Sequence, residues 1–394
     1  MAKQRTKNSQ IRIGVIGVSG RGKLARNLHQ PQGDSVVVAG ADIHAKFADE
    51  FHADYGADAF FTTDYRRLLE RKDIDAVVVT SPDHCHAEHT IAALQAGKHV
   101  YSEKPLAITV ADCDRILKTY KASGRKLMMG FNMRYANLFR CMKDIVASGT
   151  IGEIKAVWVR HFVGFGGRWY YHDWHADRRN STSLLLQKAS HDFDMIHWIA
   201  GDYTAKVSAF GSLDFYGGNK PNKRECPTCP DRRDCPEYQE WPHHQFCCFR
   251  KEVNVEDNNV VIMQLSHGIK ACYTQCHFTP DYWRNYVFIG TEGRMENLDD
   301  TTEVIVKMRK GRRWSNLSDR RYIVKKAEGG HGGADPVICR DFLDLLLTGK
   351  QPLSSPLDGR MSVAVGCAAT ESLRAGGKVV SIPPLPPSLR GMKG

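Results

Sequence analysis

The sequence has no long apolar run, and this excludes a membrane-spanning helix. Its longest purely apolar stretches are short, as in Ala76-Val77-Val78-Val79, whereas a helix that crosses a bilayer needs about 20 apolar residues. Residues 1–10 are polar and basic and no apolar segment follows them, so we expect no secretory signal and a cytoplasmic location. Hydrophobic residues make up 42% and charged residues 25% of the 394 residues, which excludes a disordered chain, a collagen and a coiled coil. A chain of this length predicts about two domains.

The sequence also lacks a dense block of charge of one sign. Lys and Arg number 55 against 44 Asp and Glu, a net charge of +11. The densest basic clusters, at residues 220–224 and 307–313, are short, whereas nucleic-acid-binding domains gather basic residues on one face or along one helix. We therefore expect no nucleic-acid partner and no membrane partner, and a basic surface that attracts anionic ligands.

Short apolar strands alternate with helix-like segments over residues 1–130. Strands are expected at residues 11–16, 35–41, 76–80, 99–102 and 128–130. Helices are expected near residues 22–30, 45–54, 86–97 and 109–123. Strands separated by helices of this length form βαβ units. The predicted fold class of this first domain is α/β, with a doubly wound parallel sheet covered by helices on both faces.

The pattern changes from about residue 151. Longer, partly alternating strands are expected at residues 154–162, 206–213, 260–265, 269–275 and 286–290. Helices are expected near residues 189–200, 335–348 and 359–375. This predicts a second domain over residues 131–380, of the α+β class, with a mostly antiparallel open sheet. Residues 381–394 form a Pro-rich tail that we expect to be extended or loose.

The first predicted strand ends in a glycine-rich turn, and a helix pattern follows. Gly17 and Gly22 fit the first and third glycines of the GxGxxG pattern, in which a tight turn and a helix N-terminus face a diphosphate. Ser19 stands at the second glycine position, and Gly20 beside it restores room for the backbone. The turn therefore predicts these cofactor contacts: Gly17, Ser19, Gly20, Arg21 and Gly22.

Asp42 ends the second predicted strand, 25 residues after Gly17. A carboxylate at this position accepts hydrogen bonds from the ribose hydroxyls of NAD and repels the 2′-phosphate of NADP. No basic residue immediately follows it, so the sequence favours NAD. The alternative is a solvated turn residue at the end of a strand.

Several motifs further along the chain identify a family. Residues 75–105 read DAVVVTSPDHCHAEHTIAALQAGKHVYSEKP, residues 130–135 read GFNMRY, residues 191–194 read HDFD and residues 330–333 read GHGG. Together they resemble the Gfo/Idh/MocA family of nicotinamide-dependent sugar and polyol oxidoreductases, over nearly the whole chain. The resemblance implies an N-terminal Rossmann domain and a C-terminal domain whose open sheet forms one wall of the active site.

The resemblance also implies further contacts with the cofactor. Residues 83–86 carry side chains of metal-ligand type, but neighbouring residues at a strand end rarely point at one ion. We therefore expect this loop beside the nicotinamide ring. The residues expected along the cofactor are Ser81, Pro82, His84, His86, Glu103, Lys104 and Asn132.

Lys104 is the first predicted catalytic residue. It follows a strand in the motif Glu103-Lys104-Pro105, where burial near the cofactor would lower its pKa and make it a proton acceptor. Family members use this lysine to orient the substrate hydroxyl and relay its proton. The alternative is a surface salt bridge to Glu103.

His191 is the second predicted catalytic residue. Many family members carry Asp-x-x-x-His here, but Gln187 stands at the Asp position, and an amide cannot act as a carboxylate base. His191 therefore becomes the better candidate for the general base, with an ordinary pKa close to working pH. Lys188 adds a cation beside it. The alternative for His191 is a capping or core histidine.

Further residues are expected to hold the substrate. Aromatic faces stack on sugar C–H surfaces and arginine donates to hydroxyls, although a core role for Trp174 is equally compatible with the sequence. His331 resembles a family position that holds substrate hydroxyls. The predicted substrate contacts are Arg134, Arg160, Trp174, Gln187, Lys188, His191 and His331.

Five of the twelve cysteines lie within residues 226–248. A reducing compartment makes a disulfide framework unexpected, and a hydrophilic segment with several prolines needs another way to become ordered. A Cys-x-x-Cys knuckle with two further thiolates predicts a tetrahedral structural zinc that shapes or covers the substrate cleft. Disulfides, an iron–sulfur cluster and free thiols are alternatives, with His243 and His244 as rival ligands. The predicted ligands are Cys226, Cys229, Cys235 and Cys247.

The function predicted from these patterns is an NAD-dependent oxidoreductase. It transfers a hydride between the nicotinamide and a secondary hydroxyl of a sugar, a sugar derivative, an inositol or a glycoside. One alternative is a redox-neutral glycoside hydrolase or lyase that acts through a transient keto-sugar. Another is a non-catalytic sensor, although a sensor need not keep an acid–base pair. The resemblance also implies a homo-oligomer, a dimer or a tetramer.

Overall fold

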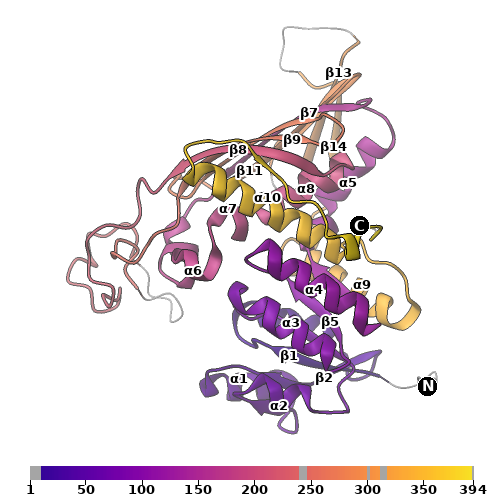
Figure 1. Ribbon diagram of the computed structural model, residues 1–394, viewed down its shortest axis with the longest axis vertical. Coiled ribbons are helices and arrows are strands. Elements are labelled where there is room, and N and C mark those ends of the chain that lie inside the picture. Colours follow the sequence, from indigo (N-terminus) through magenta and orange to yellow (C-terminus); the bar gives the residue numbers. More distant parts are fainter. Residues whose placement is uncertain (1–9, 239–245, 300–301, 311–316, 393–394) are drawn as a thin grey trace. The chain divides into compact units, whose positions relative to one another are not determined.

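The computed structural model describes residues 10–238, 246–299, 302–310 and 317–392, and the chain divides into two compact units (Figure 1). The first unit comprises Met1–Ala136, Ala327–Arg360 and Leu385–Gly394, and the second comprises Asn137–Lys326 and Met361–Pro384. Within the described ranges no helix combines the length and the hydropathy of a membrane span.

The first unit is built on a six-stranded sheet in which every neighbouring pair is parallel. Its strand order is β3-β2-β1-β4-β5-β6, so the order reverses between β1 and β4, where such sheets bind their ligands. The predicted α/β class is confirmed, and only β3 is missed. The strands are β1 (Ile11–Ile16), β2 (Ser35–Ala41), β3 (Phe60–Thr62), β4 (Ala76–Val79), β5 (His99–Glu103) and β6 (Leu127–Gly130).

Helices cover the sheet of the first unit, as the alternation of strands and helices predicts. The short 3₁₀ helices are η1 (Gly20–Leu28), η2 (Ala45–Phe47), η3 (Asp83–Cys85), η4 (Asn132–Tyr135) and η7 (Pro387–Leu389). The α-helices are α1 (Ala48–Tyr55), α2 (Tyr65–Leu69), α3 (His86–Gln95), α4 (Val110–Ser123) and α9 (Ala334–Thr348).

Helix α9 departs from the domain scheme expected from the sequence. It was expected in a second domain running to residue 380, but Ile338 and Phe342 pack with Ile13 and Val15 in the core of the first unit. Burial of this apolar face explains why α9 joins a sheet more than 200 residues earlier in the chain. The predicted loose tail is also partly anchored, since Leu389 is buried.

The second unit is built on a nine-stranded sheet of order β14-β13-β12-β11-β7-β10-β9-β8-β15. All of its neighbouring pairs are antiparallel except β10 with β7, which confirms the mostly antiparallel sheet. The strands are β7 (Ile154–Phe162), β8 (Thr204–Ser212), β9 (Asn258–Leu265), β10 (Lys270–Cys276), β11 (Trp283–Gly290), β12 (Gly293–Asn297), β13 (Glu303–Met308), β14 (Arg320–Ile323) and β15 (Val380–Ser381).

The two faces of this sheet differ. Val157, Val159 and His161 on β7 are buried, whereas Trp158 between them is 57% exposed, because successive strand residues face opposite sides. Helix α8 packs against the buried side of β7. The helices of this unit are α5 (Asn137–Ala147), η5 (Gly167–Tyr171), η6 (Trp174–Ala176), α6 (Arg178–Ser181), α7 (Leu184–Gln187), α8 (Ser190–Ala200) and the greater part of α10 (Pro356–Arg374).

Candidate active-site residues in the two units

The turn after β1 has a backbone that only glycine fits at two positions. A Cβ on Gly17, whose φ is +87°, would lie 2.6 Å from the backbone nitrogen of Ser81, and a Cβ on Gly22 would lie 2.1 Å from the Gly17 oxygen. Gly20 also has a positive φ, of +51°, but faces open space. The tight turn and the open space before η1 fit the diphosphate of a dinucleotide.

Asp42 lies just beyond β2 and contacts the same turn. Its Oδ2 accepts a hydrogen bond of 3.3 Å from Ser19 Oγ, and its Oδ1 accepts one of 3.1 Å from the backbone N–H of His44. Asp42 is only 9% exposed, which argues against a merely solvated turn residue. The serine that replaces the second glycine thus helps to hold the carboxylate expected to bind ribose.

Arg21 connects the turn to two carboxylates of the first unit. Its Nε donates to Glu103 Oε1 at 2.6 Å, and its two terminal nitrogens donate to the carboxylate of Asp335 at 2.7 and 3.0 Å. Burial opposes the charge, but both carboxylates raise the pKa of the Arg21 guanidinium. Asn132 Nδ2 donates to Asp335 at 3.2 Å, and His331 Nδ1 lies 2.8 Å from it. Arg21, predicted as a cofactor contact, therefore also organises the surrounding side chains.

Glu103 and Lys104 lie at the end of β5. Glu103 is 4% exposed. Its carboxylate accepts from the Tyr101 hydroxyl at 3.2 Å and from the backbone N–H of Lys104 at 3.0 Å, in addition to Arg21. Glu103 therefore fixes the backbone of Lys104, whose side chain is half-buried. The Glu103 carboxylate is bonded to protein groups, so these hydrogen bonds do not support a direct contact between Glu103 and the cofactor.

His86 joins the loop after β4 to the loop after β5. Its ring nitrogens lie 2.6 Å from the Pro105 oxygen and 2.7 Å from the Ser81 oxygen, and the side chain is 1% exposed. Burial lowers the pKa of His86. His86 therefore positions these loops and has no exposed surface for a cofactor, whereas Pro82 and His84 at the same turn are exposed.

In the second unit, Asp192 in the first turn of α8 is fully buried against the sheet. It accepts hydrogen bonds from the Tyr286 hydroxyl and, at 2.9 Å, from the Tyr273 hydroxyl. His161 Nδ1 lies 3.0 Å from Oδ2, and Arg284 Nε lies 3.1 Å from Oδ1. Burial opposes ionisation, but Arg284 and His161 hold the pKa of Asp192 well below its usual range. This network anchors the turn of α8 that carries His191.

A row of polar residues crosses four neighbouring strands on the same buried face. The register pairs Asn259 with Gln275, Gln275 with His161, and His161 with Arg284. Within the described ranges, the side-chain nitrogen and oxygen of Asn259 and Gln275, and Nε2 of His161, are buried and have no hydrogen-bond partner. Buried polar atoms are normally bonded, so these atoms keep unused hydrogen-bonding capacity, although Asn259, Gln275 and His161 are at most 1% exposed. Burial lowers the pKa of His161 to about 3, which keeps it neutral.

The sequence motifs did not single out this row. The signal available was the alternation along β7, where His161 follows the buried Val157 and Val159 at a spacing of two residues. The HDFD motif contained Asp192 but gave no indication of its partners, which come from strands 31 to 94 residues away.

The remaining predicted residues around the start of α8 lie in the second unit. Gln187 ends α7 and is buried, and His191 is half-buried. The ammonium of Lys188 lies 5.6 Å from the centre of the Tyr170 ring, and burial lowers the pKa of Lys188. The Trp174 ring stacks on His175 with 3.7 Å between centroids.

Two predicted substrate residues lie elsewhere. Because strand side chains alternate, Arg160 is on the face of β7 opposite His161. There its guanidinium lies 4.1 Å from the centre of the Trp283 ring. Arg134 is 3% exposed and bonds Asp358 at 3.0 Å inside the first unit. These placements argue against a substrate role for either arginine.

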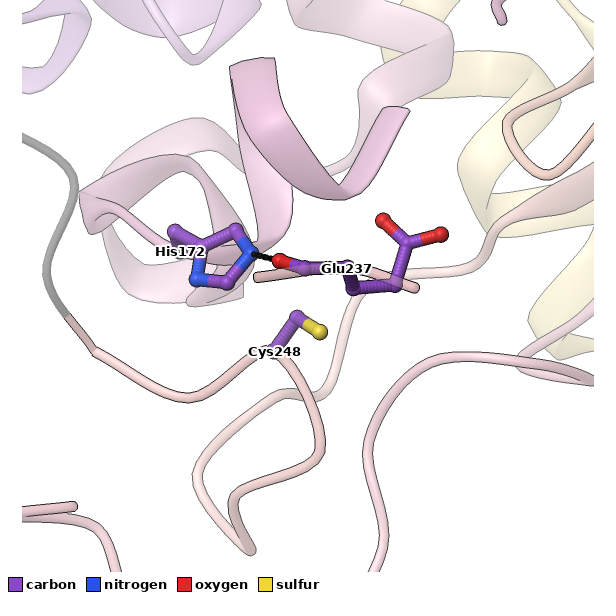
Figure 2. Close-up of side chains that lie close together, drawn as sticks. All are labelled: His172, Glu237 and Cys248. Carbon is purple, nitrogen blue, oxygen red and sulfur yellow. Dashed lines mark hydrogen bonds between the residues drawn. The ribbon is translucent and has the colours of Figure 1, made fainter. Parts of the chain in front are cut away.

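The cysteine-rich segment brings together residues that its spacing did not reveal. His172, Glu237 and Cys248 offer ligand atoms that all lie within 4.8 Å of one another (Figure 2). Cys226 Sγ lies 3.5 Å from His172 Nδ1, whereas Cys229 Sγ accepts hydrogen bonds from Arg224. The twelve cysteines, all of them within the described residues, form no disulfide. The rival ligands at positions 243 and 244 lie outside the described residues.

Comparison with known proteins matches both units. Residues 11–131 match the family model GFO_IDH_MocA, described as "Oxidoreductase family, NAD-binding Rossmann fold". Residues 143–382 match GFO_IDH_MocA_C, described as "Oxidoreductase family, C-terminal alpha/beta domain".

Similar proteins include two dehydrogenases and one solved structure. The myo-inositol 2-dehydrogenase of Thermotoga maritima is 27% identical over 368 residues, 92% of this chain and 96% of that protein. The inositol 2-dehydrogenase of Gluconacetobacter diazotrophicus is 39% identical over 201 residues, 50% of this chain and 57% of that protein. A levoglucosan dehydrogenase solved with NADH and levoglucosan has a TM-score of 0.75 and 21% identity, over 95% of this chain and 100% of that chain.

Proposed function

Because the chain belongs to the Gfo/Idh/MocA oxidoreductase family, we propose that it is an NAD-dependent dehydrogenase of a carbohydrate. Its substrate is a sugar, a sugar derivative, an inositol or a glycoside, oxidised at a secondary hydroxyl. The observation that carries the proposal is the glycine-only turn after β1, with the Asp42 carboxylate hydrogen-bonded to Ser19 beside it. The similar proteins named for inositol and levoglucosan support the substrate class.

The residues of the first unit fit NAD. When bound, NAD supplies the ring that accepts a hydride from the carbinol carbon. The backbone around Gly17, Gly20 and Gly22 faces the diphosphate, and Asp42 accepts the ribose hydroxyls. A negative charge at Asp42 disfavours a 2′-phosphate, which is the reason to propose NAD over NADP.

Lys104 orients the substrate hydroxyl. A hydroxyl that becomes a carbonyl must release its proton, and an amine held at a fixed backbone position can receive a hydrogen bond from that hydroxyl and relay the proton. Glu103 holds the backbone nitrogen of Lys104 at 3.0 Å, and Arg21 holds Glu103. These two residues are positioning residues for Lys104.

His191 takes the proton as the general base. Gln187 carries no carboxylate and cannot do so. The neighbouring Asp192 is bonded by groups from three strands of the sheet, and this anchors the backbone turn on which His191 lies. An anchored base loses less entropy when the substrate binds.

The buried polar row supports a substrate rich in hydroxyls. Amide side chains both donate and accept, whereas neutral His161, whose Nδ1–H donates to Asp192, offers only the accepting Nε2. Asn259, Gln275 and His161 therefore offer both kinds of hydrogen bond from one sheet face, which suits a polyol or a sugar.

The direct test incubates the purified protein with NAD and a panel of inositols, sugars and glycosides. The expected result is NADH absorbance that rises together with a keto product identified by mass, in equal amounts. The proposal would be contradicted if no compound of the panel were turned over with NAD or with NADP.

A second candidate is redox-neutral cleavage of a glycoside through a transient keto-sugar. Gln187 in place of the expected carboxylate and Lys188 beside it favour this possibility, since both alter the acid–base groups at the start of α8. Release of the aglycone without net NADH would support this candidate over the dehydrogenase.

A cytoplasmic location stays a prediction. We also propose that the protein forms a homo-oligomer through the outer face of the nine-stranded sheet. Trp158, Phe210 and Ile262 on this face are 57%, 62% and 59% exposed, and a contiguous apolar surface of this kind favours association with a second copy. Light scattering should give a dimer or tetramer, and Trp158→Lys should shift it toward the monomer. A wild-type monomer at micromolar concentration would contradict this.

A further inference from the structure

We propose that the second unit binds a zinc ion through His172, Cys226, Glu237 and Cys248. This site differs from the four cysteines that spacing alone indicates, because it joins the cysteine-rich segment to His172, the residue that follows η5. The proposal does not depend on the proposed enzymatic function.

The first argument is the hydrogen bonding of His172, which is 1% exposed. Its Nε2 lies 2.9 Å from the backbone oxygen of Glu237, and its Nδ1 lies 2.6 Å from the backbone oxygen of Phe246. These contacts hold the imidazole ring beside the thiols of Cys226 and Cys248, as a backbone carbonyl holds the ring of a metal-binding histidine.

The distance from His172 Nδ1 to the Cys226 thiol also suits zinc. Zinc lies about 2.0–2.1 Å from nitrogen and about 2.3 Å from sulfur in tetrahedral sites, which separates the two ligand atoms by about 3.5 Å. The observed separation between His172 Nδ1 and Cys226 Sγ is 3.5 Å. The spacing of this pair therefore fits a shared zinc ion.

The third argument is the composition of the cluster. Ligand atoms of His172, Glu237 and Cys248 lie within 4.8 Å of one another, and Figure 2 shows these three side chains gathered from separate parts of the chain. Cys226 and Cys248 are 6% and 1% exposed. Cys226 is not one of these three residues and lies beside His172 Nδ1. With Cys226 as the fourth ligand, two thiolates, an imidazole and a carboxylate form a set that zinc accepts.

The structure separates this set from one rival, Cys229. The Cys229 thiol accepts hydrogen bonds from Arg224 Nη2 and Nε at 3.0 and 3.2 Å, so a guanidinium already engages it. Burial raises the pKa of the Cys248 thiol, and the charges of Glu237, Cys247, Cys235 and Cys226 add to this effect. Cys235 and Cys247 therefore also lie near Cys248 and are the alternatives that mutagenesis must exclude.

The role of the ion is structural. The core of this region is a small cluster around Tyr171, Tyr216 and Val255, and a segment with so little apolar surface to bury needs a crosslink. Zinc at His172 and Cys248 would tie the cysteine-rich segment to η5 and to the loop that carries Trp174.

The experiment measures metal content in the full-length protein purified under anaerobic conditions without added metal. Elemental analysis should find about one zinc per chain. His172→Gln and Cys248→Ser should each lose at least tenfold of this zinc. Cys229→Ser, the matched control, should keep it, and so should Cys235→Ser and Cys247→Ser. Wild-type protein without zinc, or with iron and sulfide in its place, would overturn the proposal. The proposal would also be overturned if Cys229→Ser lost its zinc while Cys248→Ser kept it.

A second measurement applies if these variants fail to fold. Wild-type protein stripped with a chelator and reloaded with cobalt chloride should show thiolate-to-cobalt charge transfer in the near ultraviolet. Reloading with zinc chloride should restore a Tm lowered by about 5 °C or more on stripping. A cobalt spectrum without thiolate bands, or a Tm unaffected by both steps, would overturn the site.

Discussion

In the first unit the charged groups near the turn after β1 bond one another, whereas in the second unit a row of buried polar atoms has no partner within the described ranges. Arg21 is held by Glu103 and Asp335, while the amides of Asn259 and Gln275 are unbonded. A preorganised cluster suits a ligand that is the same in every turnover. Polar side chains whose hydrogen bonds are not yet made suit the part of the protein that distinguishes one polyol from another. This contrast is what the proposed function expects if the first unit binds the cofactor and the second selects the substrate.

The largest effect that this comparison predicts is at Lys104. Lys104→Met should lower kcat about 10³-fold, because the hydroxyl loses its hydrogen-bond partner and proton relay, while the Kd for NADH changes less than threefold. Steady-state kinetics and calorimetry measure the two quantities. Lys121→Met, an exposed lysine bonded to the Ser388 oxygen, is the matched control. A Lys104→Met variant with wild-type kcat removes the catalytic assignment.

The next effect is on the stability of the second unit. Asp192→Asn should lower the free energy of unfolding by about 3 kcal/mol, since it leaves the Arg284 guanidinium buried without its carboxylate. Urea unfolding measures this, with the exposed Asp144→Asn as control.

The same variant should change the pH dependence of stability. The pKa of Asp192 is held below its ordinary value, so its contribution is complete above about pH 3.9, the ordinary carboxyl pKa. The contribution is lost as the pH falls through the lower pKa of the folded state. Wild-type stability should therefore drop more steeply below about pH 4 than that of Asp192→Asn. Parallel curves would be inconsistent with an ionised Asp192.

A smaller effect is expected on cofactor choice. Asp42→Ala should weaken NADH binding by about 2 kcal/mol, or about 30-fold, because a charged acceptor is lost, and should reduce the preference over NADPH. Fluorescence titration with both cofactors measures this, with the exposed Asp49→Ala as control. Unchanged affinity for both cofactors would remove Asp42 from the site.

The smallest effect sharpens the contrast between the units. Gln275→Leu should raise KM about fivefold, because the substrate loses one hydrogen bond worth about 1 kcal/mol. The affinity for NADH and the free energy of unfolding should be nearly unchanged. Thr274→Val, its neighbour on the opposite face of β10, is the control and should leave KM unaltered. If both variants behave alike, the row does not face the substrate.

The sequence predicts best where one short segment contains the whole signal. The turn from Gly17 to Gly22 and the strands β1, β2 and β4 follow from local pattern, and the structure confirms those strands. The three-residue strand β3 is too short to leave a pattern. Helix α9 is correctly located along the chain, but its partners in the core, such as Ile13, are far away in sequence.

The sequence predicts least where neighbouring residues point in opposite directions or where distant ones meet. Arg160 was predicted as a substrate contact, and the structure places it on the face of β7 opposite His161, because a shift of one residue in a strand changes the face. The partners of Asp192 come from three strands. The cluster of His172 with Cys248 spans 76 positions, and Cys248 is not one of the four cysteines predicted as ligands from their spacing. Such juxtapositions depend on the tertiary fold, and spacing alone does not encode them.

The most direct test of the central claim is a titration of the wild-type protein with NADH and with NADPH, followed by nicotinamide fluorescence. The claim that the turn after β1 and Asp42 receive NAD predicts saturable binding of NADH at least about tenfold tighter than that of NADPH. Saturable binding of neither cofactor, or tenfold tighter binding of NADPH, would contradict it.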